Sequence, residues 1–369
     1  MRVLIAGGGS AGHVNPALAI AKEIRKKQED TQILFVGSVD GLEKDLVPLE
    51  GFDIKFIQIK GFKRSLSFDT IKTFFIMIKG FFQARKIVKQ FKPDISIGTG
   101  GFVSGPVLLA AYLKKSKIMI HEQNTFPGIT NRLLSRISDI SLSAYESTKE
   151  HFKRAKKIVV TGNLIDTAFE NMETYSVSSG LKNIVIIGGS QGAMTINRVV
   201  AQMINEFIKK DDFSLIFAPG KKHYDLVMST IKRDLVKDLP NVLIKDYIYE
   251  REKTYKKADL MITRGGAISI SEVLAMGKPA IIIPSPFVPD RAQERNAEFI
   301  YEKKACEIIY DDETFTAQKL YDKIKKMISN PDALMDLSQR AYALGIKDAS
   351  VRVFKEYMEL YDEVKSIRK

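Results

Sequence analysis

The sequence is poor in the residues that form disulfides and metal centres. Cys306 is the only cysteine among 369 residues, so the chain cannot form an internal disulfide. It has four histidines and no H-x-x-x-H pattern, and it has no D-x-D run. We therefore expect neither a disulfide-linked fold nor a metal ion or other cofactor. No apolar run is long enough for a signal peptide or a membrane span, which predicts a soluble protein of the cytoplasm.

Acidic residues are also scarce, but only in one half of the chain. Lys and Arg number 57 against 44 Asp and Glu, which gives a net charge of +13. Residues 1–163 hold 26 basic and 14 acidic side chains, a net of +12, whereas the remaining residues are close to neutral. Such an excess suggests an anionic partner: nucleic acid, a membrane surface or a phosphorylated substrate. No nucleic-acid-binding motif is present, and the balanced second half disfavours a general polyanion binder.

What the chain does contain is two series of short apolar strands separated by helical patterns. Such alternation predicts parallel sheets covered by helices, and the length predicts two domains. The first series is Val3–Ala6, Ile33–Val36, Ile95–Ile97, Ile118–Ile120 and Ile158–Val160, and the second is Asn183–Ile187, Ser214–Ala218, Val242–Ile244, Leu260–Thr263 and Pro279–Ile283. The predicted fold class is α/β, with two doubly wound Rossmann-like domains facing a central cleft. The C-terminal stretch Ala349–Lys369 is strongly helical.

Glycine-rich turns follow the first strand of each series. They are Gly7–Gly12 (GGGSAG) and Gly188–Gly192 (GGSQG), and each leads into a helix. Glycines at such a turn let backbone N–H groups approach an anion, and the helix dipole adds positive potential. Further turns of this kind are Gly98–Pro106 and Gly265–Glu272, and a polar run follows at Asp290–Asn296. Together they predict a cleft for a phosphorylated ligand.

The first turn also fits the G-x-G-x-x-G pattern of nicotinamide and flavin enzymes. That fold needs an acid at the end of its second strand to hold the ribose, and here the strand ends in Gly37-Ser38. A dinucleotide site is therefore disfavoured. A tight structural turn without a ligand stays open as an alternative for each glycine turn.

His13 is the candidate for proton transfer, because it follows the first glycine turn directly. An imidazole can take a proton from an attacking hydroxyl near neutral pH. The alternative is that His13 only positions substrate or caps the turn. His121 begins a His-Glu-Gln-Asn run at a strand end and is more simply explained as a structural histidine.

Several motifs in order along the chain resemble the MurG family of bacterial peripheral glycosyltransferases. They are Gly7–Pro16 (GGGSAGHVNP), Gly100–Pro106 (GGFVSGP), His121–Asn124 (HEQN), Gly128–Asn131 (GITN), Thr161–Asn163 (TGN), Gly188–Ala193 (GGSQGA), Arg264–Glu272 (RGGAISISE) and Asp290–Asn296. The resemblance implies a GT-B fold with an acceptor and membrane-side domain at 1–163 and a UDP-GlcNAc-binding domain at 164–341. It also implies a C-terminal helix, 342–369, that returns to the first domain.

The activity that the resemblance implies is an inverting, metal-independent transfer of GlcNAc from UDP-GlcNAc. The acceptor would be the C4 hydroxyl of MurNAc-pentapeptide in lipid I, a lipid-linked diphosphate, and the product would be lipid II for peptidoglycan synthesis. The protein would work at the cytoplasmic face of the bacterial cell membrane as a peripheral protein, on an anionic membrane surface and without nucleic acid.

The resemblance also implies site residues. His13 is the candidate general base. Substrate-binding positions are Ser10, Ala11, Gly12, Asn124, Ser190, Ile248, Ala267, Ile268, Ser269, Ile270, Ser271, Glu272 and Gln293, and positions on the acceptor or membrane side are Lys63, Arg64, Gly101, Phe81 and Phe82. Ile248 would offer its backbone to uracil, and Glu272 could accept two hydrogen bonds from the ribose diol. Glu272 could instead compensate a helix dipole, and Gln293 could lie on an exposed helix face.

The chain departs from the family pattern in two places. Family members commonly carry an Arg shortly after the TGN motif, whereas this chain has Asp166 there. An acid beside a diphosphate would repel it, so we assign Asp166 no binding role. The loop at Gly61–Ser65 also lacks further glycines often seen there.

Residues 60–92 combine basic and aromatic side chains. They contain nine Lys or Arg, one acid (Asp69) and seven of the 21 phenylalanines. Ile71, Phe74, Phe75, Ile78 and Phe82 recur at helical spacing, and Lys72, Lys79 and Lys86 follow another stripe. Such a helix suits an anionic membrane interface. The alternative is a core-facing amphipathic helix with a solvated basic edge.

Other functions remain open at this point. Within the same fold, the alternatives are a glycolipid synthase or a UDP-sugar 2-epimerase that transfers nothing to an acceptor. From other classes, they are an RNA- or DNA-binding protein, favoured only by the high isoelectric point of about 9.4, and a nicotinamide-dependent oxidoreductase.

Overall fold

The computed structural model describes residues 1–61, 68–152, 154–169, 175, 178, 180–189, 192–210, 212–232 and 238–368. The chain forms two compact units. Unit 1 comprises Met1–Leu164 with Asp348–Lys369, and unit 2 comprises Ile165–Lys347. The second boundary lies after Lys347 rather than after residue 341, because helix α13 (Pro331–Leu344) packs on helix α10 (Ala267–Ala275) of unit 2.

Unit 1 is built on a seven-stranded sheet of order β3-β2-β1-β4-β5-β6-β7, and every pair of neighbouring strands is parallel. Its strands are β1 (Arg2–Gly7), β2 (Gln32–Ser38), β3 (Asp53–Ile57), β4 (Ile95–Gly100), β5 (Lys117–Glu122), β6 (Ile140–Ser143) and β7 (Ile158–Val160). Its helices are α1 (Ala11–Lys27), α2 (Glu43–Leu49), α3 (Phe68–Phe91), α4 (Gly101–Tyr112), α5 (Ile129–Leu134), the 3-10 turn η1 (Glu146–His151) and α14 (Ala349–Arg368).

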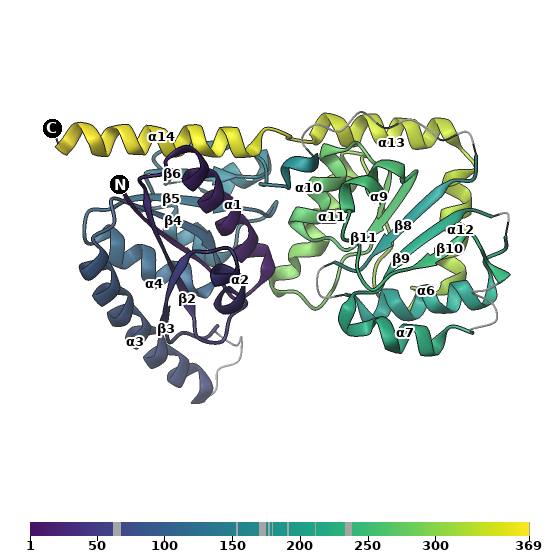
Figure 1. The fold of residues 1–369 in the computed structure, drawn as a ribbon, viewed down its shortest axis with the longest axis horizontal. Coiled ribbons are helices and arrows are strands. Elements are labelled where there is room, and N and C mark those ends of the chain that lie inside the picture. The colour runs from purple at the N-terminus through teal and green to yellow at the C-terminus, as the bar shows by residue number, and fades with distance from the viewer. Residues whose placement is uncertain are drawn as a thin grey trace. The chain divides into compact units, whose positions relative to one another are not determined.

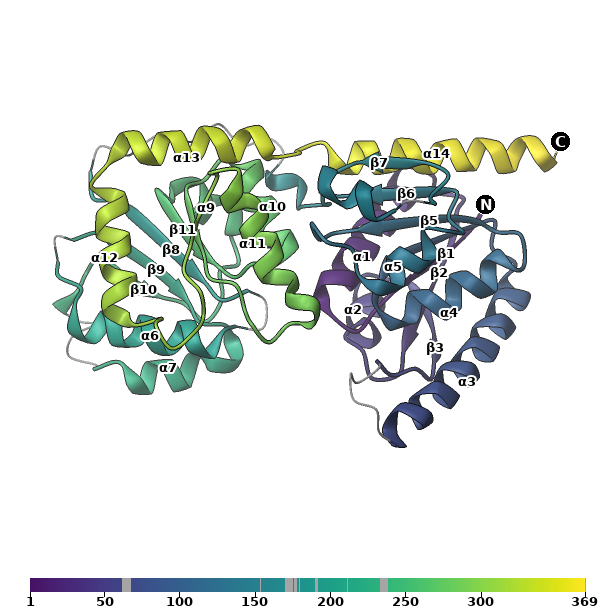
Figure 2. The ribbon, with the colours of Figure 1, turned by 180° about the vertical axis from the view of Figure 1, so that it is seen from behind.

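Alternate residues of β1 point to two separate cores, one on each face of the sheet. Val3 and Ile5 pack with α1, α2 and α14, whereas Leu4 and Ala6 pack with α3, α4 and α5. Figures 1 and 2 show this layered arrangement, with α14 along the side of α1 and with α3 and α4 on the other side. Helix α1 begins at Ala11 and accommodates Pro16 in its second turn.

Unit 2 repeats the same topology with six parallel strands in the order β10-β9-β8-β11-β12-β13. Its strands are β8 (Asn183–Ile187), β9 (Ser214–Ala218), β10 (Val242–Ile244), β11 (Leu260–Thr263), β12 (Ala280–Ile282) and β13 (Glu307–Ile308). Its helices are α6 (Met194–Glu206), α7 (Tyr224–Thr230), α9 (Arg251–Lys257), α10, α11 (Ala292–Glu302), α12 (Ala317–Ile328) and α13, and its 3-10 turns are η2 (Thr167–Phe169), η3 (Lys221–His223) and η4 (Pro289–Arg291). In both sheets the order reverses beside the first strand, which is where open α/β sheets bind ligands.

Candidate active site

The first glycine turn places the N-terminus of α1 at the carboxyl end of β1. Gly9 adopts a φ of 87°, and Ser10 is the extended N-cap residue whose carbonyl accepts from the N–H groups of His13 and Val14. Gly9, Ser10 and Gly12 are exposed, and Ala11 is half-buried. The first turn of α1 therefore faces solvent, as a substrate-contacting element must.

A buried carboxylate that the sequence analysis missed occupies this turn. Glu43 is fully buried and accepts hydrogen bonds from Gly9 N (2.9 Å), Ser38 N (2.7 Å) and Ser38 Oγ (2.7 Å). A Cβ atom at Gly8, Gly37 or Gly41 would lie less than 3.0 Å from the Glu43 side chain. The expectation that the first glycine turn holds its N–H groups open to an anion is therefore wrong for Gly9. A pyrophosphate there would meet an acid, which argues against a dinucleotide site.

His13 is held in one tautomer by its neighbours. Its Nδ1 lies 3.0 Å from Thr99 O and 3.3 Å from Gln123 Oε1, and both of these atoms accept hydrogen bonds. Nδ1 must therefore carry the hydrogen, which leaves the lone pair on Nε2. Thr99 Oγ1 also donates to the His13 carbonyl at 2.7 Å. The half-buried ring thus presents a basic nitrogen that bonds to nothing in the described part of the chain.

The His-Glu-Gln-Asn run supports this arrangement from β5. Gln123 Nε2 donates to His121 O (3.0 Å) and lies 3.1 Å from His121 Nδ1, so its amide oxygen faces His13. His121 is fully buried, and its Nε2 donates to Gly162 O at 3.0 Å. Burial lowers the pKa of His121 and keeps it neutral. His121 is therefore a structural residue, as expected. It also helps to position His13, because it contacts Gln123, whose amide oxygen faces the His13 ring.

Glu122 fixes the loop that follows. Its buried carboxylate accepts from Asn124 N (3.0 Å), Asn124 Nδ2 (3.0 Å), Gly128 N (3.1 Å) and Asn131 Nδ2 (2.9 Å). Asn124 is half-buried, so part of the residue remains accessible. The loop is thus rigidly held with Asn124 at its surface.

The glycine turn after β4 packs directly on the first one. Gly101 has a φ of 81°, and a Cβ atom there would collide with the Gly8 carbonyl. A Cβ atom at Gly100 would lie 2.8 Å from His13 Nδ1. Gly101 was expected on the acceptor side. The close approach of the two backbones explains why this residue is a glycine.

In unit 2, the N-terminus of α10 is the corresponding candidate for contact with a ligand. Gly266 is its extended N-cap residue, and Ala267, Ile268, Ser269 and Ser271 are half-buried. Amides in the first turn of a helix have no partner within the helix and favour anions. Ile270 differs from its neighbours because its side chain is fully buried and its N–H donates to Gly266 O. The side chain and the N–H of Ile270 are therefore both engaged within unit 2.

Glu272 lies one turn further along α10 and forms an ion pair. Its side chain is 2% exposed, and Arg251 Nη1 lies 2.8 Å from its Oε1. The Arg251 guanidinium also covers the Phe169 ring at 5.4 Å, and Phe169 stacks on Tyr255. Burial raises the pKa of Glu272 to about 7 despite the opposing effect of Arg251. The ion pair with Arg251, rather than compensation of the helix dipole, therefore explains the buried glutamate at this position. Arg251 is a second residue that the sequence did not indicate.

Gln293 and Ile248 complete this part of unit 2. Gln293 is half-buried, its Oε1 accepts from Ser285 N at 2.9 Å, and a Cβ atom at Gly265 would collide with its carbonyl. Gln293 therefore lies against the turn before α10 rather than on an exposed helix face. The Ile248 side chain is buried in the core, so only its backbone can meet a ligand.

Three expected site residues lie outside the described residues. They are Ser190 in the second glycine turn, and Lys63 and Arg64 in the loop before α3. On α3 itself, Phe82 is 58% exposed, whereas Phe81 is half-buried and packs on the core. Both phenylalanines were expected on the acceptor or membrane side, and of the two only Phe82 is exposed. The described residues contain no cluster of three or more His, Cys, Asp or Glu able to hold a metal ion.

Comparison with known proteins identifies a family for both units. A relative from Caldanaerobacter subterraneus subsp. tengcongensis is 45% identical over 361 residues, 96% of this chain and 98% of the relative. A relative from Bacillus cytotoxicus is 36% identical over 98% of this chain and 99% of its own length. Both are named UDP-N-acetylglucosamine--N-acetylmuramyl-(pentapeptide) pyrophosphoryl-undecaprenol N-acetylglucosamine transferase.

Solved structures agree with this relationship. The crystal structure of MurG from Acinetobacter baumannii matches with a TM-score of 0.79 and 26% identity, over 97% of this chain and 99% of that one. A UDP-GlcNAc 2-epimerase from Neisseria meningitidis shares the fold with a TM-score of 0.65 and 17% identity, over 97% and 100% of the two chains. The expected α/β fold of two Rossmann-like domains and the resemblance to MurG are confirmed. Residues 3–141 match the glycosyltransferase family 28 N-terminal domain and residues 183–353 match its C-terminal domain, so the chain belongs to glycosyltransferase family 28.

Proposed function

We propose that this glycosyltransferase moves GlcNAc from UDP-GlcNAc to the C4 hydroxyl of MurNAc-pentapeptide in lipid I, which yields lipid II for peptidoglycan synthesis. Full-length relatives that carry this activity in their names support the substrate pair. The arrangement around His13 supports the chemistry most directly. It presents Nε2 as a base beside an exposed helix N-terminus.

Unit 2 provides the features that suit the nucleotide. The first turn of α10, from Ala267 to Ser269, is proposed to meet the diphosphate, because helix N-terminal amides stabilise anions. Glu272 is proposed to accept hydrogen bonds from the ribose diol through the oxygen that Arg251 leaves available. Ile248 would offer its backbone to uracil, and Ser271 and Gln293 would border the site.

Unit 1 is proposed to supply the catalytic base. The acceptor C4 oxygen attacks the anomeric carbon of GlcNAc from the face opposite UDP, so the C–O bond to the diphosphate breaks and the configuration inverts. The proton of the C4 hydroxyl passes to His13 Nε2, and the electron pair of the broken bond leaves with UDP. Nδ1–H donation to Thr99 O and Gln123 Oε1 disperses the positive charge that develops on the ring. Ser10 to Gly12 and Asn124 are proposed to contact the sugar that is transferred.

The test is transfer of labelled GlcNAc from UDP-GlcNAc to a lipid I analogue. We expect His13→Ala to lower kcat by about 10²- to 10⁴-fold while UDP-GlcNAc binding stays unchanged. His151→Ala is the matched control, because His151 is exposed and its ring packs on Phe126, away from His13 in the sequence. A wild-type protein without transferase activity would contradict the function, and a fully active His13→Ala variant would contradict the base. Loss of activity on chelation by EDTA would contradict a metal-independent reaction.

We also propose that unit 1 docks on the anionic cytoplasmic face of the cell membrane through α3 and α4. These helices pack on each other and expose Phe75, Ile78 and Phe82 on α3, and Leu109, Tyr112 and Leu113 at α4. Exposed apolar side chains flanked by lysines suit a lipid interface. No helix in the described residues has the length and apolar character to cross a bilayer.

Flotation with phosphatidylglycerol vesicles tests this docking. The double variant Phe75→Ser, Phe82→Ser is expected to bind vesicles more weakly and to keep its affinity for UDP-GlcNAc. Leu226→Ser removes an equally exposed apolar side chain from unit 2 and is expected to leave vesicle binding unchanged. Equal vesicle binding by all three proteins would exclude a role for the α3 face.

A further inference from the structure

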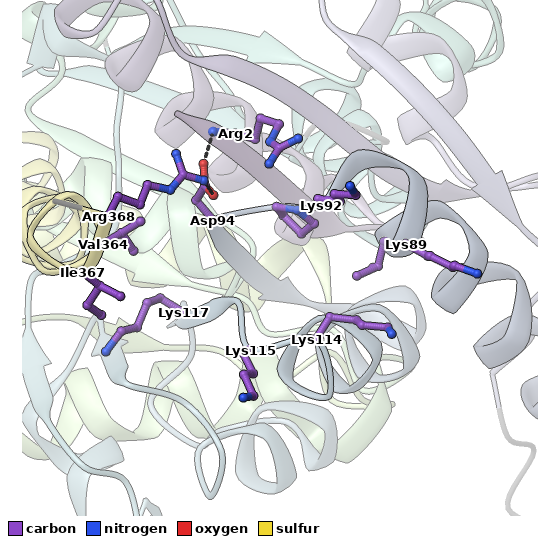
Figure 3. A pocket seen from close by; sticks show the side chains of 12 residues that line it. Arg2, Lys89, Lys92, Asp94, Lys114, Lys115, Lys117, Val364, Ile367 and Arg368 are labelled. Atoms are coloured by element: carbon purple, nitrogen blue, oxygen red, sulfur yellow. Dashed lines mark hydrogen bonds and ion pairs between the residues drawn. The ribbon is translucent and has the colours of Figure 1, made fainter.

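A basic pocket opens in unit 1 where α3, α4 and α14 end and where β1, β4 and β5 begin. It has a volume of about 560 Å³. Figure 3 shows the side chains that line it, with the lysines around the opening and with Val364 and Ile367 of α14 on one side. His13 and the glycine turns lie at the carboxyl ends of the strands. The pocket lies at their amino ends, so it is separate from the candidate active site.

The charge of the pocket is strongly unbalanced. Asp94 is its one acid, and it is already satisfied by the Arg2 backbone N–H (2.7 Å) and by an ion pair with Arg368. Lys117 pairs with Glu363 at 2.5 Å. Within the described residues, no acidic partner meets the other basic groups of the lining, which are the side chains of Arg2, Lys89, Lys92, Lys114 and Lys115. Five cations from three segments of the chain, which are the start of β1 and the ends of α3 and α4, thus surround one opening.

Two of these lysines adopt the left-handed backbone conformation, which is unfavourable for residues other than glycine. Lys92 has a φ of 52° and Lys115 a φ of 61°, each just beyond the end of a helix. Glycine or asparagine usually fills this left-handed position after a helix. Strained residues concentrate at functional sites. Lysines near a helix end also balance its dipole, but Lys89 in the last turn of α3 does so without strain.

We propose that this pocket binds a phosphate-bearing anion, either the headgroup of an anionic lipid or a free phosphate compound. Lys89, Lys92, Lys114 and Lys115 provide the positive charge, and the half-buried Val364 and the exposed Ile367 provide an apolar edge beside it. Ammonium groups act as point charges on phosphate and need no rigid geometry. The site is independent of the proposed transfer reaction.

The two strained lysines allow a test in which the fold is preserved. The double variant Lys92→Gly, Lys115→Gly removes two charges and relieves both left-handed conformations, so its Tm should equal or exceed that of the wild type. Lys304→Gly is the matched control. Lys304 has a φ of 56° just beyond α11 in unit 2, outside the pocket.

Binding is measured with phosphatidylglycerol vesicles, with phosphatidylcholine vesicles and with inorganic pyrophosphate. We expect the double variant to bind about 25-fold more weakly, since each of the two lysines near an anionic surface contributes roughly a fivefold factor. A loss confined to phosphatidylglycerol vesicles assigns the site to a lipid headgroup, and a loss that includes pyrophosphate assigns it to a free phosphate compound. The proposal is overturned if the double variant binds every probe as tightly as Lys304→Gly. Transfer to a water-soluble acceptor analogue should be unchanged, which separates this result from the proposed function.

Discussion

At the scale of single residues, three buried carboxylates organise the loops around the candidate site. Glu43 accepts from the first glycine turn, Glu122 from the loop that carries Asn124, and Glu272 from Arg251. A buried carboxylate is stable only when hydrogen bonds or a cation replace the lost water. These three residues are therefore fixed by their surroundings, and each in turn fixes a segment proposed to touch substrate.

Glu43→Gln should loosen the first glycine turn. The substituted amide presents one oxygen and one donor to groups that all donate, so at least one bond is lost inside the core. We expect unit 1 to lose about 1–3 kcal/mol of stability and the Gly9 amide to exchange faster with deuterium. Ser38→Ala, which removes one hydroxyl donor and leaves the Gly9 bond, should keep the slow exchange of Gly9. Unaltered exchange in Glu43→Gln would show that the turn does not depend on this carboxylate.

Glu272 should make stability depend on pH in an unusual direction. Its pKa in the folded protein is about 7, against 4.5 for an unperturbed carboxyl. Between these values the folded state holds a proton that the unfolded state has released, so stability falls as pH rises through this window. In the wild type, the free energy of unfolding should fall by roughly 3 kcal/mol across this window. We expect Glu272→Gln to show no such fall. Urea unfolding between about pH 4.5 and 7.5 measures the difference, and identical slopes for the two proteins would contradict it.

At the scale of elements, α14 completes a core that belongs to the beginning of the chain. Val353, Tyr357 and Leu360 are at most 2% exposed and pack with α1 and the first sheet. Lys157, directly before β7, also pairs with Glu356 at 2.6 Å. The helix is therefore part of unit 1 in the same sense as α1.

Leu360→Ala should accordingly destabilise unit 1. Removing a fully buried leucine costs about 2–5 kcal/mol in proteins, whereas Val351→Ala on the exposed face of the same helix should cost less than about 0.5 kcal/mol. Val351 is 55% exposed, so it controls for a change of helix propensity. Chemical unfolding monitored in unit 1 measures both. Equal effects would mean that α14 is not packed as part of the core.

Among the elements, those with simple apolar patterns were predictable from the sequence and those with mixed patterns were not. Strands β8, β9, β10 and β11 match their predicted bounds, because each is a short, almost unbroken run of apolar residues in the sequence. Strand β6 was missed because its Ser141 and Ser143 are polar by sequence yet fully buried, with hydroxyls bonded to Ser138 Oγ and Tyr145 O. Strand β3 was missed because it is an edge strand whose side chains are mostly exposed.

The candidate site shows the same limit. His13 and Glu272 were predictable because they stand within or beside glycine-rich turns. Glu43 and Arg251 lie in ordinary charged helical segments, and only tertiary contacts with Gly9 and Glu272 reveal them. Phe81 likewise packs on the core because of the orientation of α3 about its own axis. Helical spacing alone does not determine that orientation.

At the scale of the whole molecule, the two units have separate hydrophobic cores and need not unfold together. The proposed nucleotide site lies in unit 2. UDP at about 100 times its Kd should therefore stabilise unit 2 by about 2.7 kcal/mol. Hydrogen exchange should slow in α10 and its neighbouring strands and stay unchanged in β1 and β4. Slower exchange confined to unit 1 would contradict this assignment of the nucleotide.

The return of α14 also bears on the order in which the chain can fold during synthesis. Unit 2 is continuous from Ile165 to Lys347, so it can fold as soon as that stretch has left the ribosome. Synthesis of unit 1 begins first, but one of its cores is incomplete until the twenty residues of α14 have emerged. The unit whose synthesis begins first is therefore completed after unit 2, and the face of β1 and α1 that α14 covers stays open to chaperones until α14 has emerged.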